Sequence, residues 1–126
     1  MAGSIGYVEL GYALQNKLPF ATVQNKSGNF VVPSIASVSA AATGVAIPAD
    51  YRVSITDSAG KEAYPISSFT YLLIYKNQKN AAKGKALVDF LKWAAHDGQK
   101  MAAALYYSPL PDVVVKRVEQ TITQIK

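Results

Sequence analysis

Apolar side chains recur at the three- and four-residue spacing of an α-helix in the C-terminal half of the chain. The longest such stretch is residues 81–97, with Asn80 at the position of an N-cap. Gly98 interrupts the pattern, residues 99–105 predict a further short helix, and Pro111 suits the first turn of a final helix. The predicted stripes are Leu87, Val88, Leu91, Ala94 and Ala95 in the long helix, and Val114, Val118, Thr121 or Ile122, and Ile125 in the last one.

Shorter elements are predicted in the first half. Residues 5–9 have the composition of a strand, and residues 10–16 have helical spacing that Pro19 ends. Two β-forming runs, residues 20–24 and 30–32, flank a loop of Asn, Lys, Ser, Gly and Asn. Such a loop between two apolar runs predicts a β-hairpin.

The hairpin is followed by a helix signal and then by a long loop. Ser34 stands ahead of an apolar stripe in residues 35–43, and Gly44 follows it. A serine before the first turn and a glycine after the last are typical of helix caps. Residues 45–62 contain proline, glycine and one alternating run, so we predict a loop with a single short strand.

The most apolar run is residues 69–75, Phe-Thr-Tyr-Leu-Leu-Ile-Tyr, which ends at a charged Lys-Asn-Gln-Lys turn. Neither the helical nor the strand period dominates it, and its residues are mostly β-formers. We therefore predict a strand that is buried on both faces, as in a parallel sheet covered by helices. Together with the helix signals this predicts an α/β fold with a mixed sheet, flanking helices and a helical C-terminal tail.

Composition is that of a globular domain. Half of the 126 residues are hydrophobic and 17% are charged, and no apolar run approaches the roughly 20 residues that span a bilayer. The opening Met-Ala-Gly-Ser lacks the basic and apolar regions of a signal peptide, so none is expected. The chain has no cysteine, which leaves neither disulfides nor thiolate metal sites.

The net charge of +5 is concentrated in residues 76–126, which hold nine basic and four acidic side chains. Such an excess favours anionic partners, but a solvated helical surface explains it as well, and we prefer that interpretation. Eight tyrosines among the lysines leave stacking on single-stranded nucleic acid as a third possibility. Most of those tyrosines lie in apolar contexts, so packing is the default and no nucleic-acid partner is expected.

Four blocks carry a resemblance to a known family: GSIGYVELGYALQNKLP, AYPISSFTYLLIYK, ALVDFLKWAAHDGQK and LYYSPLPDVVV. In this order and spacing they resemble the C-terminal part of the periplasmic phosphate-binding proteins of high-affinity phosphate ABC transporters. The likeness is weakest over residues 30–50. Complete members of that family are much longer than this chain.

The resemblance implies a fragment of a two-lobed periplasmic-binding-protein fold, in which an anion is enclosed between lobes joined by crossing strands. Residues 1–64 look like part of the second lobe, residues 65–76 like the strand that crosses the hinge, and residues 77–126 like the C-terminal helices of the first lobe. The implied function is periplasmic binding of phosphate and its delivery to an ABC permease, without catalysis and without a cofactor.

A dry phosphate site needs backbone N–H donors at helix N-termini, hydroxyl donors and an arginine grip. In the family most of these come from segments that precede the matching part, and no Ser-Gly-Thr motif occurs here. We therefore carry no phosphate ligand over. The remaining cleft-lining candidates are Ser67, Ser68, Thr70 and Tyr7. For Ser67, Ser68 and Thr70 we prefer a local role in satisfying backbone groups or packing, and for Tyr7 a surface role.

Other site chemistry is poorly supported. His96 is the only histidine, so a metal site or a catalytic triad would have to be built around it alone, and a role at a helix end is favoured instead. No metal site is expected. Trp93 is expected to be buried, with its indole covering a sheet edge.

Two functions remain in view. The first is phosphate binding that depends on the missing N-terminal part, and the second is a self-associating structural or interaction module with no ligand. In either case the unpaired strand predicts a homo-oligomer, possibly a domain-swapped dimer hinged at Pro65. The residues expected at that interface are Phe69, Leu72, Ile74, Leu87 and Leu91.

Overall fold

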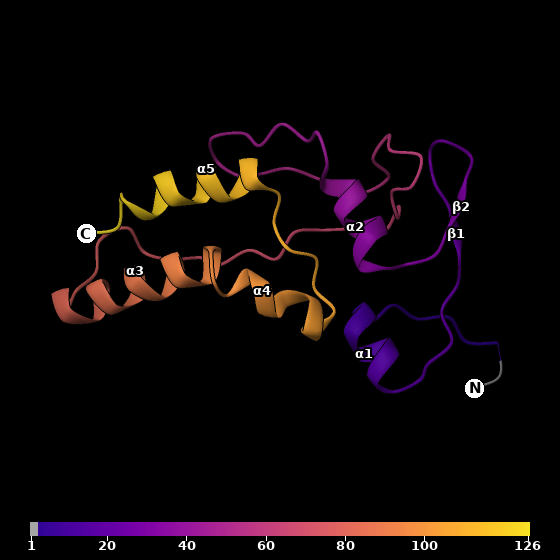
Figure 1. Cartoon of the computed structure of the whole chain (residues 1–126), viewed down its shortest axis with the longest axis horizontal. Helices are drawn as coiled ribbons and strands as arrows, with labels where there is room; N and C mark the ends of the chain where they lie inside the picture. The colour runs from indigo at the N-terminus through magenta and orange to yellow at the C-terminus, as the bar shows by residue number, and fades with distance from the viewer. Residues whose placement is uncertain (1–2) are drawn as a thin grey trace.

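The computed structural model of the chain describes residues 3–126. In that range the order is helix, hairpin, helix, a long irregular segment, and then a helical C-terminal part (Figure 1). The elements are α1 (Leu10–Gln15), β1 (Val23–Gln24), β2 (Phe30–Val31), α2 (Ile35–Ala42), α3 (Ala81–Ala95), α4 (Gln99–Ala102), the 3-10 helix η1 (Ala103–Leu105) and α5 (Asp112–Ile122).

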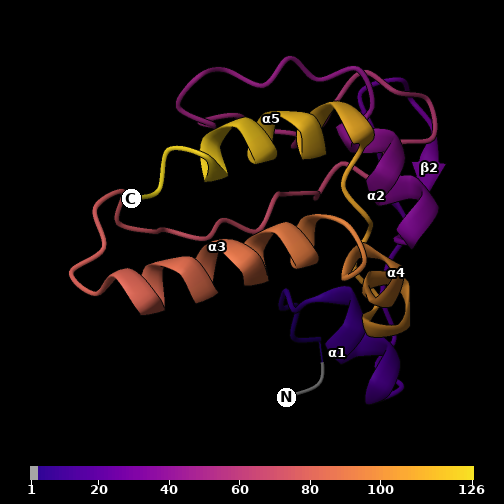
Figure 2. The same ribbon diagram turned by 60° about the vertical axis from the view of Figure 1, so that its left-hand side comes forward.

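Helices α3 and α5 pack side by side and form the larger apolar cluster (Figures 1 and 2). Leu91 and Ala95 of α3 and Val114 and Ile122 of α5 are buried. The charged side chains of Lys85, Asp89 and Lys92 on α3 are exposed. Spacing alone therefore identified the buried stripes correctly.

The helix caps also follow the sequence. Ser34 and Ser37 form a capping box at the start of α2, and the Asn80 side chain accepts a hydrogen bond of 3.0 Å from the Lys83 N–H at the start of α3. Beyond α2, Gly44 has a φ of +75°, a conformation that favours glycine. The last helix begins at Asp112 with Pro111 as its N-cap, one residue later than predicted.

The predicted hairpin is present with shorter strands. Val23 pairs with Val31 and Gln24 with Phe30 in an antiparallel two-stranded sheet. Behind it, the buried Asn25 side chain joins the hairpin to the loop before residue 64, because its Nδ2 donates to the carbonyl oxygens of Lys61 (2.8 Å) and Ala63 (3.1 Å). The hairpin, that loop and α2 consequently form a second packed group.

Three predicted strands are wrong. Residues 5–9 and 69–75 have no regular secondary structure, and residues 45–62 form a loop without a strand. Within residues 3–126 the β1–β2 ladder is the only one. A strand exists only where a neighbour supplies the complementary N–H and C=O groups, and a run of β-formers does not provide that neighbour.

The expected two-sided burial of residues 69–75 is wrong for the same reason. Leu73 is 97% exposed and Tyr75 87%, although Phe69 and Ile74 are half-buried. Trp93 is 46% exposed and stacks near Phe90, with ring centroids 5.9 Å apart, because there is no sheet edge for its indole to cover. Mixed helix and sheet is correct as a class, but the sheet is only the hairpin.

The chain has a large surface for its mass. It exposes 9359 Å² at 13.5 kDa, whereas a compact monomer of this mass exposes about 6,500 Å². Large apolar side chains, among them Ile5, Leu73 and Tyr75, are among the exposed ones. No helix within residues 3–126 has both the length and the apolar character needed to cross a bilayer.

Candidate functional site

The four candidate cleft residues do not form a cluster. Ser67 is buried and its Oγ donates to the Tyr64 carbonyl oxygen at 2.8 Å, while the exposed Ser68 donates to the Phe69 carbonyl oxygen at 3.2 Å. Thr70 is exposed, and Tyr7 is 96% exposed in the N-terminal segment. Among the described residues no hydrogen bond joins Tyr7 to any of the three hydroxyl residues. The serine contacts are local, of the kind that satisfies backbone groups.

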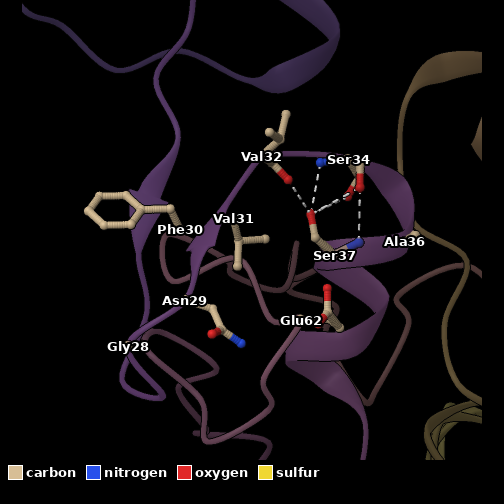
Figure 3. Close-up of a pocket in the computed structure, with 9 residues that line it drawn as sticks. All are labelled: Gly28, Asn29, Phe30, Val31, Val32, Ser34, Ala36, Ser37 and Glu62. Atoms are coloured by element: carbon tan, nitrogen blue, oxygen red, sulfur yellow. Dashed lines mark hydrogen bonds between the residues drawn. The ribbon is translucent and has the colours of Figure 1, made fainter.

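One hollow lies between the hairpin and α2 (Figure 3). It has a volume of about 740 Å³ and is wide open to solvent. We call it the hairpin hollow; it is lined by Gly28, Asn29, Phe30, Val31, Val32, Ser34, Ala36, Ser37 and Glu62. Its position next to the first turn of α2 makes it the natural place to look for an anion site.

The polar groups of the hairpin hollow are already used within the fold. Ser34 Oγ accepts from the Ser37 N–H at 3.1 Å, and Ser37 Oγ accepts from the Ser34 N–H at 2.9 Å (Figure 3). The Ser37 hydroxyl can donate to the Val32 carbonyl oxygen at 2.9 Å. Glu62 adds a negative charge, and no cationic side chain lines the hollow. This arrangement repels phosphate.

A smaller hollow of about 240 Å³ carries the opposite charge. We call it the basic groove; it lies between residues 45–47 and α5, and it is lined there by Val113, Lys116, Arg117 and Gln120. Tyr51 holds the loop on the helix, because its hydroxyl donates to the Arg117 carbonyl oxygen at 2.8 Å. The groove offers two cationic side chains but no converging backbone N–H groups, so it can attract an anion without enclosing it.

His96 lies at the C-cap of α3, and its Nε2 is 2.6 Å from Glu119 Oε1 on α5. The imidazole thus joins the two packed helices, which agrees with a helix-end role. Within residues 3–126 no three His, Asp or Glu side chains gather into a possible metal site.

Surface ion pairs account for most of the side chains whose pKa departs from its ordinary value. The hydrogen bond from Lys85 (2.9 Å) lowers the pKa of Asp89, and the hydrogen bond from Lys100 (2.7 Å) lowers the pKa of Asp97. The pKa of each lysine is raised by the same contact. The first pair lies on α3 and the second joins the turn after α3 to α4, and neither pair lines either hollow.

Two tyrosines have a raised pKa for different reasons. The Tyr107 hydroxyl donates to Glu9 Oε1 at 3.1 Å, and this hydrogen bond raises the pKa of Tyr107. Burial raises the pKa of Tyr64. The Glu9 contact joins the N-terminal segment to the chain before α5, so Glu9 serves here as a surface tie.

The most connected polar side chain was not predicted. Asn25 was interpreted as a turn residue, yet its Oδ1 accepts from the Ser27 and Asn29 N–H groups while its Nδ2 reaches the carbonyl oxygens of residues 60, 61 and 63. An asparagine at the start of a turn is a signal for the local half of this network. The half that reaches across more than 30 residues has no local signal.

Comparison with known proteins gives a consistent relationship. No family model matches the chain. The phosphate-binding protein PstS of Xylella fastidiosa is 45% identical over 119 residues, which cover 93% of this chain and 33% of that protein. This chain is homologous to one segment of PstS. The PstS proteins of Pasteurella multocida and Methanocaldococcus jannaschii are each 37% identical over 98% of the chain, and the match covers 37% and 35% of their lengths.

The chain thus spans about a third of the length of the PstS proteins that it matches. Neither hollow in the described residues has the donors that enclose a phosphate ion. The similarity to PstS therefore extends over the sequence of a segment of those proteins.

Proposed function

We propose that this chain is a segment of the phosphate-binding component of an ABC phosphate transporter. The observation that carries this proposal is the identity of 37–45% with PstS proteins over 93–100% of the chain. As in a binding protein, its role is to hold and deliver an ion and not to convert it. The working location is the periplasm, and the partners are inorganic phosphate and the permease.

The proposed segment is divided as the family resemblance implies. Residues 1–64 belong to the second lobe, residues 65–76 cross the hinge, and residues 77–126 complete the first lobe. In support, the hairpin packs with α2 and the Asn25-bound loop, while α3 packs with α5. Ser67, Ser68, Thr70 and Tyr7 line the cleft in this proposal, and the ligands that grip phosphate come from the remaining two thirds of the protein.

Calorimetric titration with inorganic phosphate tests the proposal. The chain alone is expected to give no submicromolar binding, because no arginine in it stands beside an anion loop. Mixed with the part of Xylella fastidiosa PstS outside the matching segment, it is expected to bind phosphate one to one. Sulfate in a parallel titration distinguishes phosphate from another oxyanion. Tight binding by the chain alone, or none by the mixture once a complex has formed, would contradict the proposal.

The second candidate is a self-associating module without a ligand. It is favoured by the exposed apolar side chains of residues 66–75, which a swapped dimer hinged at Pro65 would cover. Leu91, one of the residues expected at such an interface, is already buried between α3 and α5 in a single copy. This candidate requires a stable dimer whose association does not change when phosphate is added. Sedimentation at micromolar concentration, with and without phosphate, tests it.

A further inference from the structure

The basic groove is built by one side of α5 and by the loop that follows α2. Figures 1 and 2 show this loop running over α5. The helix contributes side chains at three- and four-residue spacing, which places them on the same side of α5. They are Val113, Lys116, Arg117 and Gln120, and the loop contributes residues 45–47. Because Val114 and Ile122 are the α5 residues buried in the apolar cluster with α3, the groove uses a different set of α5 side chains.

Tyr51 holds the loop wall of the groove in place. Its hydroxyl donates to the Arg117 carbonyl oxygen at 2.8 Å and lies 2.6 Å from Thr121 Oγ1. Tyr51 has a φ of +59°, a conformation that a bulky residue adopts only where its surroundings hold it there. The groove is therefore formed before anything binds, which lowers the entropic cost of binding.

The two cations of the groove have no partner among the described residues. Within residues 3–126 the ion pairs involve Asp50, Asp89, Asp97 and Glu119, and none of them reaches Lys116 or Arg117. Asp112, one turn before Lys116, forms no ion pair with it, and no acidic side chain lines the groove. Both positive charges are consequently available to an anionic group from outside the chain.

The size and walls of the groove indicate the kind of anion that fits. Its volume of about 240 Å³ is below the roughly 300–1,000 Å³ of cavities that enclose a small ligand. It has room for one or two side chains of another protein. Val45, Ile47 and Val113 give it apolar walls, and Val113 is 65% exposed. Arginine is enriched at protein interfaces, where its guanidinium can grip a carboxylate with two parallel hydrogen bonds.

We propose that the basic groove is a docking site for an acidic segment of a partner protein. A glutamate or aspartate carboxylate of that segment pairs with Arg117 and Lys116, and a neighbouring aliphatic side chain lies against Val113. A carboxylate with an aliphatic neighbour matches both the charge and the walls, whereas a free anion matches the charge alone. The inference goes beyond the proposed function and does not depend on phosphate binding.

Nuclear magnetic resonance titration of the isotope-labelled chain tests the inference. The probe is the peptide Gly-Glu-Leu-Glu-Leu-Gly with both ends blocked. We expect saturable shifts in the amides of residues 45–47 and 113–120, and an affinity that falls as salt is added. The same peptide with glutamine in place of glutamate should bind about fivefold more weakly or worse, because it cannot form charge-assisted hydrogen bonds.

Matched variants separate the groove from the general positive charge of the chain. Lys116→Gln combined with Arg117→Gln should weaken the peptide by about fivefold or more. Lys79→Gln combined with Lys92→Gln removes the same charge from exposed lysines elsewhere and should change the affinity by less than about twofold. All four side chains are at least partly exposed, so the circular dichroism of both variants should match the parent chain.

Each result either supports or overturns the site. Shifts in the groove that are lost with Lys116 and Arg117 and kept in the control variant support it. The absence of saturable shifts at millimolar peptide, equal weakening by the control variant, or equal binding of the glutamine peptide would each overturn it. The same shifts from sodium acetate, with the same affinity, would also overturn it, since they would indicate a site for a free anion and not for a protein segment.

Discussion

The α3–α5 pair and residues 66–75 both carry large apolar side chains, but only those of the helix pair are well buried. In the pair, Leu91 is 8% exposed and Ile122 4%, because each helix satisfies its own backbone and needs only an apolar neighbour. In residues 66–75, Leu73 is 97% exposed. An extended segment needs a neighbour that is apolar and also offers hydrogen bonds in register.

The difference shows what a helix and an extended segment each need in order to be buried. Helices α3 and α5 satisfy their own backbones and bury apolar side chains against each other within this chain. Residues 69–75 contain β-forming residues, but they have no strand partner within the described structure. The same contrast appears at the N-terminus, where Ile5 is 99% exposed just before the intact α1.

The largest expected effect is on the closed region. Leu91→Ala should reduce the free energy of unfolding by about 2–5 kcal/mol, because it leaves a cavity between α3 and α5. Leu73→Ala removes the same atoms from an exposed side chain and should change stability by less than about 0.5 kcal/mol. Urea unfolding followed by far-ultraviolet circular dichroism measures both. Equal losses for the two variants would remove the distinction between the regions.

Asn25→Ala should cost about 1–3 kcal/mol, since the carbonyl oxygens of Lys61 and Ala63 lose their buried donor. Asn77→Ala is the matched control, because this asparagine is exposed and makes no side-chain hydrogen bond within the described structure. Thermal unfolding compares the two. A loss confined to the control, or none for either, would show that the hairpin does not depend on this network.

Removal of the α3 cap by Asn80→Ala should cost about 1 kcal/mol, because the Lys83 N–H loses its acceptor. Asn80→Asp retains a side-chain acceptor and should recover most of that loss. Amide exchange in the first turn of α3 reports the local effect. An unchanged exchange rate in Asn80→Ala would mean that the cap contributes nothing.

The smallest effect is expected from the surface pairs. The pKa of Asp89 and that of Asp97 are lowered by their lysine partners, so each pair adds stability above the unfolded-state pKa of about 4. That contribution is lost as the pH falls through the lower folded-state pKa. Carboxyl NMR titration should show both values return toward the ordinary range in Lys85→Ala and Lys100→Ala respectively. Unmoved values would rule out these contacts as the cause.

Local interactions explain which parts of the fold could be predicted. Three kinds of feature were predicted and are present: the caps at Ser34 and Asn80, the stripe on α3 and the hairpin turn. Each of them depends on residues that are about four positions or fewer apart. The strand at residues 69–75 and the burial of Trp93 depended on a sheet edge supplied from elsewhere, and both predictions failed. Composition identified β-forming residues, but the sequence of a segment does not determine whether a neighbouring strand is present to pair with it.

Site chemistry divides in the same way. The motifs of the sequence contain no anion loop, and that part of the analysis needed only local residues. The hairpin hollow could not be predicted, because it arises where Glu62 approaches a turn more than 30 residues away. The hydrogen bond from the Tyr51 hydroxyl to α5 and the Asn25 network are likewise long-range contacts, and no local sequence pattern predicts them.

Amide hydrogen exchange on the chain alone tests the central contrast most directly. We predict that amides in the middle of α3, around Leu91, are protected by the stability of the helix pair, while residues 66–75 exchange at nearly the rate of an unstructured peptide. The measurement should be made at a concentration where sedimentation shows a monomer. Protection of residues 66–75 equal to that of α3 in this monomer would contradict the account, since it would mean that the chain closes its own sheet.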